Sequence, residues 1–179
     1  VVKLLKRIFF ITFITEIIGA VILAIRYIPE FGIANGIEIS IFHSVSAFCN
    51  AGFDLMGINS PYSSLISYSS DPLICITLMI LIVIGGLGFL VWDDIINHKA
   101  DFKMYSLHSK LVFATNFVLF VGGALLFMIF EDKNLFEGAP IWEKVLKGFF
   151  MSVTPRNAGF ATLDYAEISQ GSEMLTDLL

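Results

Sequence analysis

Asn50-Ala51-Gly52-Phe53 occurs a second time in the chain, 107 residues further on, as Asn157-Ala158-Gly159-Phe160. Each copy directly follows a short apolar segment, and each lies downstream of a longer apolar segment. At the same offset, Lys3-Leu4 before the first long segment matches Lys110-Leu111 before a later one. Because identical residues occupy the same place in two similar stretches, the sequence predicts an internal structural repeat.

The composition around these repeats is that of a membrane protein. Of 179 residues, 56% are hydrophobic and only 15% are charged, and the mean hydropathy is +0.82. Soluble globular chains contain roughly 45–50% apolar residues and about 25% charged residues. The net charge of −5 provides no basic face for a polyanion, so nucleic-acid binding is excluded as a function.

No set of side chains at useful spacing indicates catalysis, a resident metal or a cofactor. Cys49 and Cys75 stand in apolar stretches without further Cys or His at ligand spacing, which argues against a disulfide framework and a zinc site. His98 and His108 have no cysteine companions. Nucleophile–base, paired-carboxylate and phosphate-binding patterns are also missing from the sequence, so we expect no enzyme, no catalytic residues and no cofactor-binding residues.

Three apolar segments are long enough to cross a bilayer: residues 8–28, 73–92 and 111–130. A spanning helix needs about 20 residues, because each rises 1.5 Å and the hydrocarbon core is about 30 Å thick. The first segment contains Glu16 and Arg26, whereas the other two contain no charged residue. Core helices of a large soluble protein are the alternative, which such long uncharged runs disfavour.

Basic residues indicate the orientation of these segments. They precede the first segment and lie in the linker 93–110 between the second and third, at Lys3, Lys6, Arg7, Lys99, Lys103 and Lys110. Basic residues concentrate on the cytoplasmic side of membrane proteins, so we expect a cytoplasmic linker there. The acidic residues after residue 130 then lie outside.

Two further apolar segments, 37–48 and 141–152, are too short to span and are predicted to be re-entrant helices. A helix that enters from outside and stops midway directs its C-terminal end, about −0.5 of an elementary charge, toward the membrane centre, where it favours a cation. Pro140 is well placed to open the second of these helices.

The loops that follow, 49–54 and 153–160, have the features of an ion selectivity filter. Irregular backbone at membrane depth survives only where it is buried in protein or lines a water-filled cavity. Gly52 and Gly159 can adopt backbone angles that turn neighbouring carbonyls toward a central axis. We therefore expect K⁺ to be bound by backbone carbonyls of Asn50, Ala51, Gly52, Phe53, Asn157, Ala158, Gly159 and Phe160.

These motifs resemble those of the Trk/Ktr/HKT superfamily of potassium transporters, in particular its KtrB-type membrane subunit. The resemblance rests on Ser46-Ala47-Phe48-Cys49-Asn50-Ala51-Gly52-Phe53-Asp54, on Val153-Thr154-Pro155-Arg156-Asn157-Ala158-Gly159-Phe160, and on Ile84-Gly85-Gly86-Leu87-Gly88-Phe89 followed by Trp92. It implies an all-α membrane protein with four span–pore helix–filter–span units around one pore. Residues 1–92 would form the second unit and 111–179 most of the third, about one and a half units, so we expect the chain to be a piece of a longer protein whose gating loop falls beyond Leu179.

The resemblance also implies a function and partners. It indicates the pore-forming subunit of a potassium uptake system, with K⁺ as the transported ion and possible Na⁺ dependence, in a multi-pass bacterial plasma membrane protein. It further implies a homodimer of the full-length subunit in the lipid bilayer. A cytoplasmic nucleotide-binding regulatory ring of the KtrA/RCK type would meet the inner loops, here residues 93–109.

Two functions of other classes are kept as alternatives. A secondary transporter would bind an organic solute at broken helices whose N-termini face the substrate, whereas here the C-termini are expected to face it. A non-conducting scaffold subunit would use the repeats only for packing. Rubidium flux through the full-length protein separates these alternatives.

Several individual residues have competing interpretations. Glu16 forms either a structural hydrogen bond or a site beside the ion pathway. Arg26 is expected to reach the membrane interface, and Arg156 to pair with an acid, since a free cation there would repel ions. Asp54 either concentrates cations or is a solvated loop carboxylate. His43 is expected to be a packing residue with a local hydrogen bond.

The glycines inside the predicted spans are a separate feature. Those of Gly85-Gly86-Leu87-Gly88 and Gly122-Gly123 are expected to allow close helix packing, with hinging as the less favoured interpretation.

Overall fold

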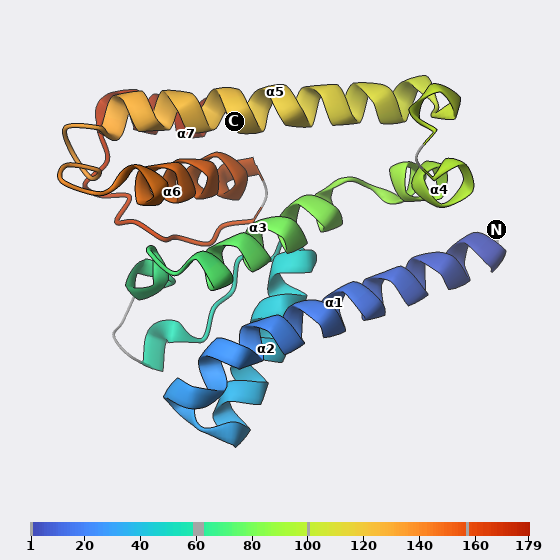
Figure 1. Cartoon of the computed structure of the whole chain (residues 1–179), viewed down its shortest axis with the longest axis horizontal. Helices are drawn as coiled ribbons and strands as arrows, with labels where there is room; N and C mark the ends of the chain where they lie inside the picture. Colours follow the sequence, from blue (N-terminus) through green and yellow to red (C-terminus); the bar gives the residue numbers. More distant parts are fainter. Residues whose placement is uncertain (1, 59–62, 100, 157) are drawn as a thin grey trace.

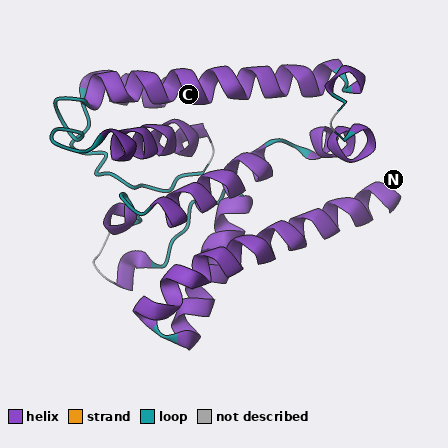
Figure 2. Ribbon diagram, in the orientation of Figure 1, coloured by secondary structure: helices purple, strands orange, loops and turns teal. Residues whose placement is uncertain are grey.

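The computed structural model describes residues 2–58, 63–99, 101–156 and 158–179. In this part of the chain the protein is all-α, with helices joined by loops and short 3₁₀ turns (Figures 1 and 2). The helices are α1 (Val2–Phe31), α2 (Ile33–Phe48), α3 (Pro72–Gly86), α4 (Phe89–His98), α5 (Leu107–Glu131), α6 (Ile141–Val153) and α7 (Gln170–Leu178).

The helices α1 and α2 form a hairpin with a single residue, Gly32, between them. Gly32 has φ +81°, a conformation that side chains disfavour, and it reverses the chain at once. As a result α1 runs past the predicted end at residue 28, through Pro29, and α2 begins at Ile33 rather than 37. A Cβ on Gly36 would lie 2.6 Å from the Cα of Ile28, so the two helices approach closely at the turn.

In both units the short helix docks on the long preceding helix through a serine and a glycine. In the first unit, the Ser44 hydroxyl donates to the Glu16 carbonyl oxygen at 2.7 Å, and a Cβ on Gly19 would lie 2.5 Å from that hydroxyl. In the second, the Ser152 hydroxyl donates to carbonyl oxygens of α5, and a Cβ on Gly123 would lie 2.4 Å from it. These small residues let α2 pack on α1 and α6 on α5.

The predicted segment 73–92 is not one straight helix. Asp71 caps the N-terminus of α3, accepting from the backbone N–H groups of residues 73 and 74, and α3 ends at Gly86. Gly88 then takes φ +82° and ψ 151°, and α4 leaves at 95° to α3. This pair of angles is accessible essentially to glycine alone. The apolar segment is therefore broken at Gly88, although no polar residue marks the position of the break.

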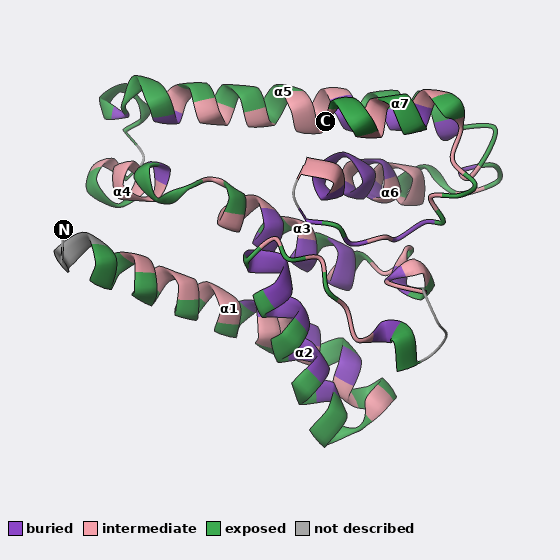
Figure 3. Cartoon of the chain, turned by 180° about the vertical axis from the view of Figure 1, so that it is seen from behind, coloured by how far each residue is buried: buried purple, intermediate pink, exposed green. Residues whose placement is uncertain are grey.

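Within the described residues, two helices are long and apolar enough to cross a membrane, and the broken pair α3 and α4 would make a third. The two unbroken helices are Leu5–Phe31 in α1 and Leu107–Glu131 in α5. Both helices have many exposed residues (Figure 3), and large apolar ones are among them, such as Phe9, Phe13, Ile17, Val21 and Ile25 of α1 and Leu111, Phe117, Val118, Leu125 and Ile129 of α5. Apolar surface of this extent belongs in a lipid bilayer.

A common hydrophobic core joins the two units. Leu23, Ile39, Ala47 and Leu78 of the first unit pack in one cluster with residues of the second, among them Leu146, Phe150, Val153, Ala158 and Phe160. A smaller cluster lies within the second unit, around Phe127, Phe136, Met151 and Leu163. Because the larger cluster includes Ala158 and Phe160, it fixes the second glycine loop against the first unit.

A further helix, α7, follows the second glycine loop and has no counterpart among the predicted elements. It returns along α5, and the Phe130 ring lies 3.3 Å from the position of a Cβ on Gly171 (Figure 1). Glu131, at the end of α5, accepts hydrogen bonds from the backbone N–H and the hydroxyl of Ser169, which caps α7. The carboxylate therefore holds the start of α7 against the C-terminal end of α5.

Candidate functional site

The two repeated glycines lie side by side. A Cβ built on Gly52 would lie 2.2 Å from the carbonyl oxygen of Ala158 and 3.0 Å from the Cα of Gly159. A Cβ on Gly159 would lie 3.5 Å from the Cα of Gly52. Both glycines have positive φ, +71° and +80°. Residues far apart in sequence are thus brought together as the repeat predicted, with the backbones too close at Gly52 for any side chain.

Each glycine loop begins at the C-terminal end of a short helix. α2 ends at Phe48, and α6 ends at Val153 and continues as a 3₁₀ turn through Arg156. The free carbonyl end of a helix carries a partial negative charge, about −0.5 of an elementary charge. Both loops therefore lie next to helix ends that attract a cation.

Gly85 of α3 allows that helix to pack directly against the end of α2. A Cβ on Gly85 would lie only 1.9 Å from the carbonyl oxygen of Phe48, so α3 passes directly against the last turn of α2. At this position the glycine of the predicted span serves close packing, as expected, whereas Gly88 three residues later lies at the 95° break.

Five carbonyl oxygens at the meeting point accept no hydrogen bond from any residue that the structure describes. They belong to Asn50, Ala51, Gly52, Ala158 and Gly159. Buried carbonyls rarely lack a partner unless water or a ligand satisfies them. Ala51 and Gly159 are exposed, Gly52 and Asn50 are half-buried and Ala158 is buried. Of these five residues, Gly52, Ala158 and Gly159 are the three that the structure places in direct contact with one another.

The carbonyl oxygens of the other predicted ligands either accept a hydrogen bond or lie outside the described residues. The carbonyl oxygens of Phe53 and Phe160 accept hydrogen bonds from the hydroxyls of Ser46, at 2.7 Å, and Thr154, at 2.6 Å. Asn157, the first residue of the second repeat, lies outside the described residues. The structure thus divides the predicted set into five free oxygens and two that are hydrogen-bonded to the neighbouring helix.

His43 packs beside both glycine loops. Its ring is fully buried, and Nδ1 lies 2.8 Å from the carbonyl oxygen of Ile39 while the backbone N–H of Leu55 donates to Nε2 at 3.4 Å. These partners assign the proton to Nδ1 and make the ring neutral. Its centroid lies 6.2 Å from that of Phe160 in the second loop. His43 is therefore the packing residue with a local hydrogen bond that the sequence predicted.

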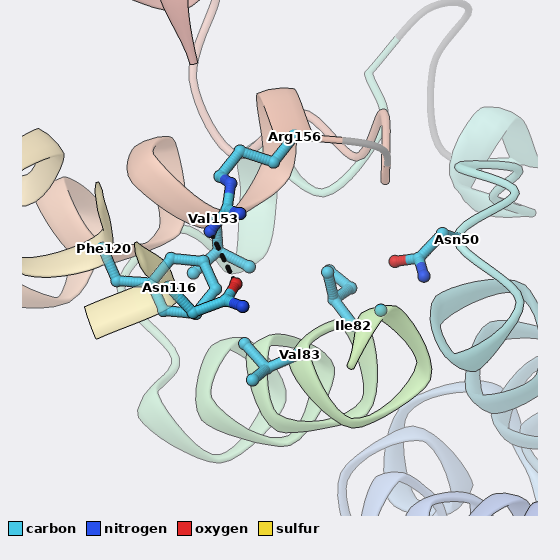
Figure 4. Close-up of a pocket in the computed structure, with 8 residues that line it drawn as sticks. Asn50, Ile82, Val83, Asn116, Phe120, Val153 and Arg156 are labelled. Atoms are coloured by element: carbon cyan, nitrogen blue, oxygen red, sulfur yellow. Dashed lines mark hydrogen bonds between the residues drawn. The ribbon is translucent and has the colours of Figure 1, made fainter. Parts of the chain in front are cut away.

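A small pocket of about 50 Å³ lies between the two units beside the loops (Figure 4). Asn50 points into it from the end of α2, and the buried Oδ1 atom of Asn50 has no hydrogen-bond partner among the described residues. Opposite lie Arg156 and Asn116, with Val153 and Phe120 completing the wall. A space of this size holds a few water molecules, which would satisfy the amide oxygen of Asn50.

Arg156 has a different partner from the acid that was predicted. Its guanidinium donates to Oδ1 of Asn116 at 2.9 Å and stacks over the ring of Phe120, 4.6 Å from the centroid (Figure 4). No carboxylate of the described residues pairs with it. The interaction with an aromatic face and an amide stabilises the cation without neutralising it, so the positive charge remains near the second loop.

The remaining charged residues singled out from the sequence have local roles. Arg26 pairs with Asp71 at 2.5 Å, which ties the outer part of α1 to the start of α3. Asp54 accepts from the backbone N–H of Met56 at 2.9 Å and shapes the turn after the first loop. The carboxylate of Glu16 is half-buried, with the Cys49 thiol 3.9 Å away, beside the end of α2.

A second ion pair orders the turn between α5 and α6. Lys144 lies 2.5 Å from Asp132, just past the end of α5. The hydrogen bond and charge of Lys144 lower the pKa of Asp132 below its ordinary value. The cation also offsets the unfavourable contact between a carboxylate and the C-terminal end of α5.

Sequence reasoning did not find Ser46, Thr154 or Asn116. Ser46 and Thr154 lie within the quoted motifs, but a hydroxyl near a helix end is too common to predict a contact with a loop. Asn116 lies 40 residues from Arg156 and inside an apolar helix. A single polar amide within that apolar run is the one signal that could have marked it.

The geometry can be compared with known proteins. The family model TrkH, described as a cation transport protein, matches residues 1–176. The potassium/sodium uptake protein NtpJ of Enterococcus hirae is 42% identical over all of this chain. The Ktr system potassium uptake protein B is 36% identical over the whole chain in Bacillus subtilis and 33% identical over 99% of it in Vibrio alginolyticus.

The chain spans about two fifths of the length of these relatives: 39% of the first two and 38% of the third. The relatives are bacterial uptake proteins, and none has a name that denotes an enzyme. Together with the long apolar helices, the matches identify a multi-pass protein of the bacterial plasma membrane.

Proposed function

Since this chain belongs to the TrkH family of cation transport proteins, we propose that it is part of the pore-forming subunit of a potassium uptake system. In this proposal the loops 49–54 and 153–160 supply part of a selectivity filter. Residues 1–92 form one pore unit and residues 111–179 most of the next, around a shared axis. The names of the relatives, which mention potassium uptake, support the choice of ion.

The observation that carries the proposal is the contact between Gly52 and Gly159, where five peptide oxygens of the two loops accept no hydrogen bond from the described residues. Carbonyl oxygens replace the hydration shell of K⁺ in known filters. Here the two C-terminal helix ends add negative potential at the same place. The transported K⁺ is therefore bound by main-chain atoms, with Asn50, Ala51, Gly52, Ala158 and Gly159 as the ligands that the geometry favours, and no side-chain metal site is required.

The proposal is tested by ⁸⁶Rb⁺ uptake through the full-length protein, with Na⁺ as competitor. Gly52→Ser should weaken discrimination against Na⁺, because a side chain cannot fit beside Ala158 without moving the carbonyls. Gly57→Ser is the matched control, since no described residue lies within 4 Å of a Cβ there and its φ is not positive. Unchanged ion preference in Gly52→Ser would reject the assignment of this loop.

Partners and co-transported ions belong to the same proposal. We expect the full-length subunit to form a homodimer, and the inner residues 93–109 to meet a cytoplasmic nucleotide-binding ring of the KtrA/RCK type. One relative is named as a potassium/sodium uptake protein, which supports a dependence on Na⁺. Size-exclusion chromatography coupled to light scattering, with and without the ring, measures both associations.

The two alternatives predict other flux measurements. A solute transporter with broken helices would direct helix N-termini at its substrate, whereas here the C-termini of α2 and α6 adjoin the glycine loops. Its rubidium flux would depend on an organic solute. A scaffold subunit would carry no flux at all.

A further inference from the structure

One hydroxyl residue at the end of each short helix holds the neighbouring glycine loop at two points. In the first unit this residue is Ser46: its carbonyl oxygen accepts from the Ala51 N–H at 2.9 Å, and its hydroxyl donates to the Phe53 carbonyl at 2.7 Å. The two contacts bracket Gly52. The loop is thus fastened on either side of the residue whose φ is positive.

Thr154 makes the same pair of contacts in the second unit. Its carbonyl oxygen accepts from the N–H groups of Ala158, at 3.0 Å, and Gly159, at 3.2 Å. Its hydroxyl donates to the Phe160 carbonyl at 2.6 Å. The two residues do not correspond in the sequence repeat, where Ser46 aligns with Val153, so the structure reproduces the contact from a neighbouring position.

On the proposed function, we infer that Ser46 and Thr154 are positioning residues for ion selectivity. Each hydroxyl holds the carbonyl that follows the glycine toward the short helix, so this oxygen is kept from the ion while the preceding oxygens stay free. Both residues are almost fully buried, with 5% and 3% of their surfaces exposed. In such surroundings the hydrogen bond is not exchanged for one with water, which makes the carbonyl direction fixed.

The loss of either hydroxyl has a specific consequence. The Phe53 or Phe160 carbonyl would lose its partner and could rotate toward the ion, which changes both the number of ligands and the rigidity of the loop. A looser set of carbonyls can close around the smaller Na⁺. Discrimination between the ions should therefore fall more than the rate of uptake.

The chain offers matched controls on the same two helices. The hydroxyls of Ser44 on α2 and Ser152 on α6 also donate to carbonyl oxygens, but these belong to α1 and α5 rather than to the loops. Ser44 and Ser152 are as deeply buried as the two positioning residues. Removing either control hydroxyl also breaks a buried hydrogen bond, but the hydrogen bonds from Ser46 and Thr154 to the glycine loops remain.

The experiment measures ⁸⁶Rb⁺ uptake by the full-length protein, alone and with Na⁺ as competitor. Ser46→Ala and Thr154→Val should lower Rb⁺ over Na⁺ discrimination by about fivefold, the factor that about 1 kcal/mol for one buried hydrogen bond produces. Ser46→Thr and Thr154→Ser keep the hydroxyl and should keep the discrimination. Ser44→Ala and Ser152→Ala should change the amount of folded protein but not the ion preference.

The inference is overturned if the hydroxyl-free variants keep normal discrimination, or if the control serines or the hydroxyl-retaining variants lose as much. The proposed function fails separately, if the unmodified protein carries no Rb⁺ or does not prefer it to Na⁺. Thermal unfolding of each purified variant is measured in parallel, and a selectivity loss without a matching stability loss supports the positioning role.

Discussion

At the scale of single residues, the two glycines of the repeat are not equivalent. Both have positive φ, so any side chain costs about 1–2 kcal/mol in backbone strain at either position. At Gly52, however, a Cβ would also collide with the Ala158 carbonyl, whereas at Gly159 its nearest neighbour lies at an ordinary 3.5 Å. The first loop therefore depends more strongly on glycine than the second.

We predict that Gly52→Ala lowers the melting temperature of the detergent-solubilised protein more than Gly159→Ala does. Strain alone acts at position 159, while strain and a backbone clash act together at position 52. Fluorescence-monitored thermal unfolding checks the order. Equal losses for the two variants would contradict the close approach of the two loops.

Whether the role of a residue could be predicted depends on how near in sequence its partners lie. The glycine repeat and the packing role of His43 could be predicted, because the first is an identity within the chain and the second depends on residues in its own helix and nearby. The partner of Arg156 could not. It depends on how α5 lies against the end of α6, which places Asn116 rather than an acid beside the guanidinium.

At the scale of helices, the break between α3 and α4 depends on one residue. Nothing lies within 4 Å of a Cβ on Gly88, so a substitution there meets no clash and pays only for its φ of +82°. Gly122 in α5 is the natural comparison, because a Cβ there also meets nothing and its φ is ordinary for a helix.

We predict that Gly88→Ala destabilises the protein by about 1–3 kcal/mol, the usual cost of a side chain in this backbone region. Gly122→Ala should leave stability unchanged or raise it slightly, since alanine is the better helix former. Denaturant or thermal unfolding of both variants in the same detergent measures the difference. A straight α3–α4 helix would instead make both substitutions stabilising.

The ion pair between Lys144 and Asp132 gives the turn from α5 to α6 a pH dependence. Because the folded pKa of Asp132 is below its ordinary value of 3.8, the pair stabilises the fold above that pH and ceases to do so as pH falls through the lowered pKa. We expect Lys144→Gln to lower the melting temperature slightly at neutral pH, and the difference from the unmodified protein to vanish in acid. Lys6→Gln, at an exposed cation on α1, should show no such convergence.

Helices were predictable where composition alone decides them. The long apolar runs of α1 and α5 and the short α6 follow from hydropathy and from Pro140. The bounds of α6 lie within one residue of the prediction, whereas α5 begins four residues and α1 six residues before the predicted starts at 111 and 8. The break at Gly88 falls in an unbroken apolar run where hydropathy gives no signal, and the glycines at residues 85–88 indicated hinging only as the less favoured interpretation. The first turn of α2 was missed because residues 29–36 were assigned to neither predicted segment, whereas α1 continues through Pro29 and α2 begins at Ile33.

At the scale of the whole molecule, contacts outside the two glycine loops hold the two units together. Leu65, in the segment after the first loop, donates its N–H to the Ala161 carbonyl at 2.9 Å, and Ser64 accepts from the Ala161 N–H. The Ser70 hydroxyl donates to Glu143 at the start of α6. These bonds and the shared core around Phe160 set the distance between the loops, and none of them is visible in the sequence as a repeat.

The most direct measurement is the position of the ion itself. Crystals of the full-length protein soaked in Rb⁺ or Tl⁺ should show anomalous scattering from a dehydrated ion in contact with the free carbonyl oxygens of Gly52 and Gly159. The hydroxyl-bound oxygens of Phe53 and Phe160 should point away from it. An empty space, a lipid chain between the two glycines, or an ion bound only by side chains elsewhere would contradict the account.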